Sequence, residues 1–277
     1  KAMLSGARDY LIKPFGQDEL SESIRNAYQA NKQHFENIES IKSCNKKEHK
    51  IPQIVTVFGT KGGVGKTTLS VNLAAQLSRI TDKKVVLIDL DLQFGDVSVF
   101  LNMLPKRTIS ELVQEKNSLE IAVVDSYLAH HSSGIEVMPA PMRPEYSELI
   151  EADYVMELIS VLRQYYDYII IDTPCYLHDT VLSALDISDQ ILLTMSMEMP
   201  SVKNTKISLD LLETLHHKGK IKLILNRVSD NFGISPCDVE TALEFIIANQ
   251  IPSDGKLVVK SVNRGIPFVL LKPHSKI

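Results

Sequence analysis

The chain has 277 residues, 44% of them hydrophobic, with a net charge of −4 and a pI of about 6.1. This length suffices for one large domain and a small one, and the charge excludes a global field that draws the protein to nucleic acid. No apolar run approaches the ~20 residues that span a bilayer. Three scattered cysteines without a CxxC motif offer no metal-ligand spacing and fit a reducing cytoplasm.

Residues 1–35 read as the end of a small α/β unit. The segment DYLIKP (9–14) is expected to form a short strand that Pro14 closes. A helix is expected from about Asp18, because acidic residues favour a first helical turn and apolar residues follow at helical spacing. The chain begins with Lys1 rather than Met, which indicates a piece cut from a longer protein.

Strand and helix patterns alternate after residues 36–52, a polar, lysine-rich segment that we interpret as a linker. Buried strands are expected at 54–58, 85–89, 135–140, 168–172, 190–195 and 221–226. Helix-length segments lie at 66–79, 145–165, 178–187, 202–217 and 235–249. Continuously apolar strands alternating with helices predict a doubly wound α/β fold with a mostly parallel sheet.

The segment GTKGGVGKTT (59–68) lies where the first of these strands meets the first long helix. It matches G-x-x-x-x-G-K-[ST], the pattern of a loop whose main-chain N–H groups surround phosphates. In this pattern Lys66 reaches the β- and γ-phosphates and the Thr67 hydroxyl is a ligand of Mg²⁺. The residues expected to bind ATP here are Gly62, Gly63, Val64, Gly65, Lys66, Thr67 and Thr68.

Lys61 is a second lysine that an ordinary phosphate loop does not need. The segment KGGVGKT (61–67) resembles the signature KGGxGKT of the ParA/MinD family of deviant Walker A ATPases, and the resemblance covers about residues 52–270. It implies a homodimer that forms on ATP. In that dimer Lys61 reaches the partner's nucleotide and neutralises charge in the transition state, as an arginine finger does elsewhere.

Three aspartates follow two of the apolar strands. VVLIDLDLQFGDV contains Asp89 and Asp91, and YIIIDTP contains Asp172. The resemblance implies that Asp89 and Asp172 hold Mg²⁺ together with Thr67, and that Asp91 belongs to a switch that positions the attacking water. All three are expected at the carboxyl edge of the sheet, where open α/β folds bind ligands.

A base-binding region is expected near the end of KLILNRV, at Asn226 and Arg227. The resemblance implies that Asn226 hydrogen-bonds adenine, and the segment IPSD (251–254) resembles a family segment near the base. An asparagine at a strand end is also a common turn former, and that reading stays open.

Two histidine pairs, His130-His131 and His216-His217, are expected on the surface. Adjacent histidines do not share a helix face, and no carboxylate stands at ligand spacing from either pair. We therefore expect neither pair to form a metal site.

The N-terminal segment narrows the resemblance to one branch of the family. MLSGARDYLIKPF (3–15) resembles the end of a response-regulator receiver domain, and DLDLQFGDVSVFLN (89–102) resembles the pilus-assembly ATPases of the CpaE/TadZ type. This implies a receiver-like fragment at 1–35 and an ATPase domain at 53–277. It also implies a cytoplasmic ATP- and Mg²⁺-dependent switch that places the Flp/tight-adherence pilus secretion machinery through partners at the cell pole.

Two other functions remain open. A DNA- or cargo-partitioning ATPase of the ParA type would need a basic surface, although the net charge gives no reason to expect specific nucleic-acid binding. A nucleotide-dependent scaffold with little turnover would use the same residues. Membrane binding of the MinD type would need a C-terminal amphipathic helix, which the sequence up to Ile277 does not contain and which a truncation would remove.

Overall fold

The structure is a computed structural model that describes residues 53–115, 119–229, 233–275 and 277. The predictions for 1–35 and for the linker at 36–52 lie outside these residues. All of the expected ATP and metal ligands lie inside them.

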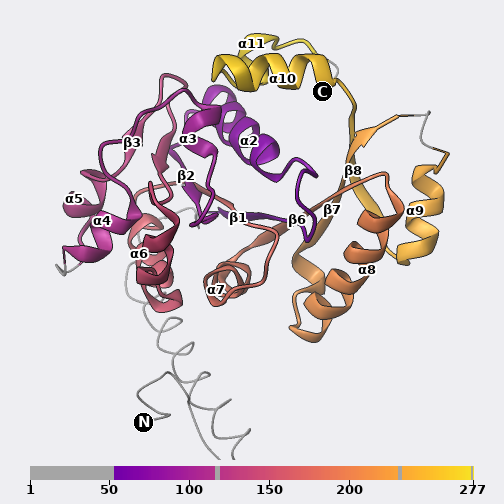
Figure 1. Cartoon of the computed structure of the whole chain (residues 1–277), viewed down its shortest axis with the longest axis horizontal. Coiled ribbons are helices and arrows are strands. Elements are labelled where there is room, and N and C mark those ends of the chain that lie inside the picture. The colour runs from indigo at the N-terminus through magenta and orange to yellow at the C-terminus, as the bar shows by residue number, and fades with distance from the viewer. Residues whose placement is uncertain (1–52, 116–118, 230–232, 276) are drawn as a thin grey trace, which may run out of the picture. The chain divides into compact units, whose positions relative to one another are not determined.

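The described chain is built on one sheet of eight strands (Figure 1). The strands are β1 (Gln53–Phe58), β2 (Val85–Asp89), β3 (Ala129–His130), β4 (Glu136–Met138), β5 (Tyr168–Asp172), β6 (Gln190–Ser196), β7 (Ile221–Val228) and β8 (Ile247–Pro252). Their order is β3-β4-β2-β5-β1-β6-β7-β8, and every neighbouring pair is parallel except β3 with β4. The predicted doubly wound α/β fold is confirmed.

Helices cover both faces of this sheet. They are α2 (Lys66–Ile80), α3 (Val97–Phe100), α4 (Ile109–Gln114), α5 (Ile121–Asp125), η2 (Pro144–Leu149), α6 (Ala152–Leu162), α7 (Asp179–Ile187), α8 (Met199–Thr214), η3 (Lys218–Lys220), α9 (Pro236–Leu243), α10 (Gly255–Arg264) and α11 (Phe268–Leu271). Figure 1 shows α2, α10 and α11 above the sheet, and α6 and α7 below it. Among the described residues, none of these helices combines the length and the apolar character that crossing a bilayer requires.

The strand pattern explains the two layers. Side chains alternate between the faces of a strand, so Ile54 and Ile169 pack among Leu158 and Leu162 of α6 on one face. Their neighbours in sequence point the other way, and Val55 packs against α2 on the opposite face. Because both faces are covered, the central strands must be apolar throughout, as the sequence shows.

The helix predicted over 235–249 is confirmed for Pro236–Leu243 and is wrong after that. Helix α9 ends at Leu243, because Glu244 takes a left-handed conformation with φ of 53°. Strand β8 follows and pairs in parallel with β7. Ile247 is its one buried residue, so β8 lacks the apolar run that marks the central strands.

Two other predicted helices have different bounds. The segment 145–165 is interrupted, because Ile150 and Glu151 are extended between η2 and α6. The segment 202–217 is helical from Met199 to Thr214, and a proline in its first turn favours the early start.

The surface prediction for the histidine pairs is also partly wrong. His131 and His217 are buried, and His217 Nε2 lies 2.8 Å from the Asp186 carboxylate of α7. His130 is exposed, but its Nδ1 lies 2.8 Å from the Glu136 carboxylate on the paired strand. Asp186 is far from His217 in the sequence, and Glu136 lies across a hairpin from His130. Residue spacing along the chain therefore did not reveal these partners.

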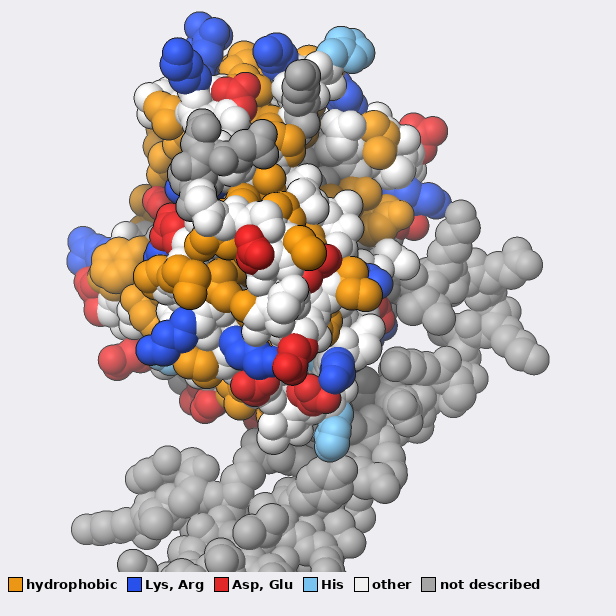
Figure 2. All heavy atoms as spheres, turned by 90° about the vertical axis from the view of Figure 1, so that its right-hand side faces the viewer, with side chains coloured by type: hydrophobic (Ala, Val, Ile, Leu, Met, Phe, Trp, Pro, Cys, Tyr) orange, Lys and Arg blue, Asp and Glu red, His pale blue; other side chains and the backbone are white. Residues whose placement is uncertain are grey.

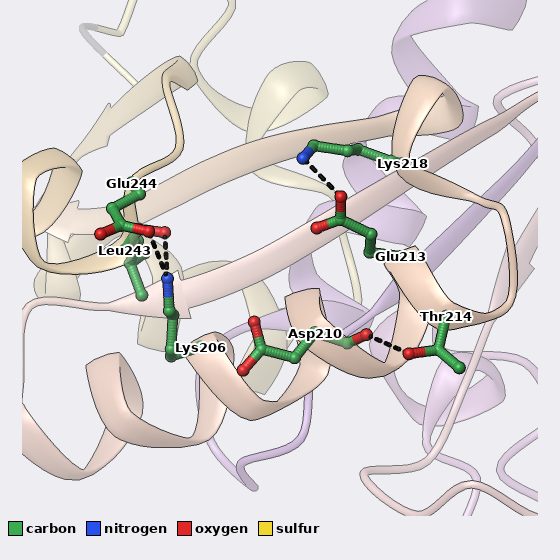
Figure 3. A network of polar contacts seen from close by, with 7 residues as sticks. All are labelled: Lys206, Asp210, Glu213, Thr214, Lys218, Leu243 and Glu244. Carbon is green, nitrogen blue, oxygen red and sulfur yellow. Dashed lines mark hydrogen bonds and ion pairs between the residues drawn. The ribbon is translucent and has the colours of Figure 1, made fainter.

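Polar contacts tie α8 to its neighbours, as Figure 3 shows. Lys206 Nζ donates to the Leu243 carbonyl at 3.1 Å and lies 3.2 Å from the Glu244 carboxylate at the end of α9. Lys218 Nζ donates to Glu213 at 2.7 Å. Exposed pairs of this kind contribute little stability each, so they fix the position of α8 more than they strengthen the fold.

Candidate nucleotide-binding site

The glycine-rich loop connects β1 to α2 and leaves the head of that helix open. Gly63 and Gly65 have φ of 76° and 98°, a region that other residues avoid. No side chain caps α2 and its first turn holds no acidic residue, whereas Thr108, Ser235 and Asp254 cap α4, α9 and α10. Free N–H groups and the helix dipole therefore favour an anion at this point.

The residues of the loop divide between the interior and the surface. Gly62 and Gly63 are exposed, Val64 is buried, and Thr68 is half-buried. Lys66 is only 9% exposed, and its Nζ donates to the Lys61 carbonyl at 3.4 Å. A buried ammonium with a single weak acceptor is suited to a negatively charged ligand.

Two carboxylates end the adjacent strands β2 and β5 directly below this loop. Asp89 and Asp172 are register partners, and each is 1% exposed. Asp172 accepts hydrogen bonds from the Thr67 and Ser70 hydroxyls, both at 2.7 Å. Asp89 accepts from two main-chain N–H groups at 3.1 Å, one of them that of Val97.

The burial of these acids is electrostatically costly. It raises the pKa of Asp172 to about 6, against the hydrogen bonds from Thr67 and Ser70, which lower it. Burial and then the charge of Asp172 raise the pKa of Asp89 well above its ordinary range. Two like charges in a buried site favour the uptake of protons or of a cation.

The donor set suits Mg²⁺. Hydroxyl and carboxylate oxygens are the ligands this ion prefers, and it usually keeps water and phosphate oxygens as further ligands. Within the described ranges no group of three or more His, Cys, Asp or Glu could hold a metal ion alone. Thr67, Asp89 and Asp172 therefore fit a cation that is shared with a bound phosphate.

The predicted catalytic side chains Lys61 and Asp91 lie at the rim. Asp91 is half-buried, and its Oδ1 accepts from the Phe94 main-chain N–H at 3.3 Å. Lys61 is half exposed and forms an ion pair with Glu198, the residue that precedes α8. In this structure Lys61 thus contacts a carboxylate of its own chain.

Asn226 lies at the end of β7, against the phosphate loop. Its Nδ2 donates to the Val64 carbonyl at 2.7 Å, and its Oδ1 accepts from the Arg227 main-chain N–H at 2.9 Å. A cavity of about 380 Å³ adjoins it, lined by Thr68, by Arg227 and by residues 251–255. The position is next to the expected phosphate site, and the cavity is in the size range of small ligands.

Two residues of the site were missed by sequence analysis. Ser70 stands three positions after Thr67, so the two share a helix face, and this spacing could have identified it. Glu198 is distant from Lys61 in sequence, and no local pattern marks it.

Comparisons with known proteins agree with this arrangement. A family model described as "AAA domain" matches residues 52–226. The septum site-determining protein MinD of Synechocystis sp. is 31% identical over 226 residues, which cover 79% of this chain and 82% of that protein.

Solved structures share the fold. A ParA family ATPase from Chlorobium tepidum TLS has a TM-score of 0.76 at 24% identity, covering 81% of this chain and 94% of that one. MinD of Pyrococcus horikoshii OT3, complexed with Mg-ADP, has a TM-score of 0.70 at 24% identity, covering 81% and 90%. With the sequence match, the loop and the paired acids, these findings show that the chain belongs to the ParA/MinD family of P-loop ATPases.

Proposed function

We propose that this ATPase is a Mg²⁺-dependent molecular switch that pairs with a second copy of itself when it binds ATP. The buried pair Asp89 and Asp172 is the main support for the Mg²⁺ site. Two buried carboxylates side by side destabilise the folded protein unless a cation neutralises them. The cation would neutralise phosphate charge next to Lys66. Asn226 and Arg227 would flank the adenine.

Hydrolysis would require the two rim residues as well. Asp91 would orient the attacking water, and Lys61 would stabilise transition-state charge on the nucleotide of the partner subunit. The half-exposed position of Lys61 supports this role, because its ion pair with the exposed Glu198 can exchange for a contact with another charged group. Loss of the γ-phosphate would then end the paired state.

The biological task that we favour is placement or assembly of a Flp/tight-adherence pilus secretion machinery. It rests on the resemblance of residues 89–102 and 3–15 to the CpaE/TadZ type, with a receiver-like fragment at 1–35, a linker at 36–52 and the ATPase domain at 53–277. Partners among the secretion proteins or a polar landmark would hold the protein at its site of action.

A second candidate is partitioning of DNA or of DNA-bound cargo. Residues 255–277 contain five Lys or Arg and no acidic residue. Lys256, Lys260 and Arg264 share the exposed side of α10, and none forms an ion pair with another described residue. Figure 2 shows basic side chains at the top of the molecule, where α10 and α11 lie.

A binding measurement tests the switch directly. Lys66→Ala should weaken ATP binding by about a hundredfold, because it removes a charge-assisted contact to phosphate. The control Lys84→Ala, which changes an exposed lysine outside the loop, should leave ATP binding unchanged. Light scattering should show ATP-dependent dimers of wild type. Equal ATP affinity of wild type and Lys66→Ala would refute the site.

Two further measurements separate the candidate tasks. If the wild-type protein binds ATP but releases negligible phosphate in a single-turnover assay, the result would favour a nucleotide-dependent scaffold with little turnover. Binding to a random DNA duplex that weakens steeply with salt and is lost on Lys256→Glu/Lys260→Glu would favour partitioning.

A further inference from the structure

A second hollow lies apart from the nucleotide site. It has a volume of about 740 Å³, and its walls are residues 101–107 after α3, residues 126–132 around β3, and residues 265, 266 and 270 at the junction of α10 and α11. None of the residues assigned to ATP, Mg²⁺ or catalysis lines it. We call this hollow the α3–β3 groove.

The groove presents apolar side chains to solvent. Leu104 is 94% exposed and Ile266 is 40% exposed, and Met103, Leu128 and Leu270 also line the walls. A single exposed leucine needs no explanation. Several apolar side chains around one hollow are typical of a surface that another molecule covers.

The charge of the groove is one-sided. Lys106 and Arg107 are exposed, and neither forms an ion pair with another described residue. The Arg107 guanidinium lies 5.1 Å from the centre of the Tyr127 ring and donates one hydrogen bond, at 3.2 Å, to the Ser126 hydroxyl. A guanidinium has five N–H donors, so Arg107 is positioned but can still bind a carboxylate.

Acidic residues are absent from the described lining of this groove, although the whole chain has 34 Asp and Glu against 30 Lys and Arg. Two lining side chains have carboxylate partners outside the lining: His130 meets Glu136 on the paired strand, and the Tyr127 hydroxyl hydrogen-bonds Glu115. The groove therefore favours a negatively charged occupant.

The walls are held in place before any partner binds. Gly265 packs so closely on Asn102 that a Cβ would lie 2.2 Å from the Asn102 Cβ atom. Asn102 itself has φ of 50°, and Val269 N donates to Asn72 of α2 at 3.2 Å. A preformed groove loses little conformational entropy when a ligand enters.

We propose that the α3–β3 groove binds a short acidic and apolar peptide segment of a partner protein. Carboxylates of the segment pair with Arg107 and Lys106, and an apolar side chain covers Leu104 and Ile266. A nucleic acid would leave that apolar surface unused. The groove also lies near the metal side of the nucleotide site, because α3, whose Val97 N–H donates to Asp89, leads into groove residues 101–107.

Peptide selection on the full chain tests the proposal. A random dodecapeptide library displayed on phage is selected on immobilised protein without nucleotide, so that the outcome does not depend on ATP binding. The selected peptides should be rich in Asp or Glu with Leu, Ile or Phe. The best peptide, labelled with fluorescein, should bind at least about tenfold more weakly to Lys106→Glu/Arg107→Glu, a loss of about 1.4 kcal/mol.

Matched variants control for charge and for folding. Leu104→Ser removes an almost fully exposed apolar side chain. It should weaken peptide binding about threefold or more without changing the melting temperature. Lys222→Glu reverses an exposed charge on β7, across the sheet, and should leave the affinity unchanged.

Several results would overturn the proposal. One is a selection that yields no peptides, or peptides without acidic excess. Another is equal binding of the best peptide to wild type and to Lys106→Glu/Arg107→Glu. If these variants instead abolish binding of a DNA duplex, or self-association measured by light scattering, the groove serves nucleic acid or a second copy of this chain.

Discussion

The floor and the rim of the nucleotide site are built in opposite ways. In the floor, Asp172 accepts short hydrogen bonds from Thr67 and Ser70, and Asp89 accepts from main-chain N–H groups such as that of Val97. At the rim, the Lys61 ammonium forms an ion pair with an exposed carboxylate of its own chain, that of Glu198. Preorganised groups bind a ligand without further ordering, whereas mobile groups respond to a second event.

This difference indicates that the floor and the rim have separate roles in binding and in turnover. The floor can hold metal and phosphate in a single chain, because each of its groups is already fixed. The rim completes the site only after Lys61 leaves Glu198, and pairing of two chains is the event that we propose. Variants of the floor should therefore act on metal binding in the monomer, and variants of the rim on turnover in the dimer.

The largest effect is expected at the floor. Asp172→Asn removes a metal ligand while it keeps the size of the side chain, so Mg²⁺-dependent turnover should fall by about 100- to 1,000-fold. ATP affinity measured in EDTA should change little, because Lys66 and the loop remain. Steady-state phosphate release and nucleotide titration provide the two measurements. Turnover within tenfold of wild type would show that the floor is not the metal site.

The same substitution should stabilise the nucleotide-free protein. The raised pKa of Asp172, about 6 against an ordinary 3.8, means that its contribution to stability is full below pH 3.8 and is lost as pH rises through 6. Asp172→Asn should thus gain up to about 3 kcal/mol at pH 8 and almost nothing at pH 4. Urea unfolding in EDTA measures this, with Asp82→Asn, an exposed turn residue, as control. A gain that is equal at both pH values would contradict the electrostatic cause.

The sequence places the floor residues together more readily than it reveals the contacts of the rim, for a physical reason. The loop, Lys66 and Thr67 are local features, and an aspartate at a strand end is visible as the last residue of an apolar run. The contacts of Lys61 with Glu198 and of Asn226 with Val64 depend on β6 lying beside β1 and on β7 lying beside β6. That order follows from tertiary packing, which no spacing within the chain reports.

The misassigned strand β8 has the same cause. Its exposed Asn249 and Gln250 carry no strand signal, and pairing with β7 overrides their local preference. The groove beside β3 was also not predicted, because it joins residues from three distant parts of the chain.

The rim gives the next largest effect. Lys61→Ala should lower turnover about thirtyfold, the loss of one charge-assisted contact to phosphate, and should leave ATP affinity unchanged. Asp91→Ala should be similarly inactive. If Lys61 acts on the partner's nucleotide, an equimolar mixture of the two variants should recover about a quarter of wild-type turnover, because half of the dimers contain one complete site of two. No recovery in mixtures that form mixed dimers would place Lys61 in its own chain's site.

The smallest effect is expected at Ser70, which touches no phosphate but orients a metal ligand. When the Thr67 hydroxyl turns to Mg²⁺, Ser70 remains the donor that holds Asp172. Ser70→Ala should raise the Mg²⁺ concentration for half-maximal turnover three- to tenfold, about 1 kcal/mol for one hydrogen bond, with little change in kcat at saturating Mg²⁺. Ser188→Ala removes a buried hydroxyl that bonds to Ala184 and Thr56, so it should lose stability but keep the Mg²⁺ dependence. An equal shift in both variants would mean that Ser70 only supports the fold.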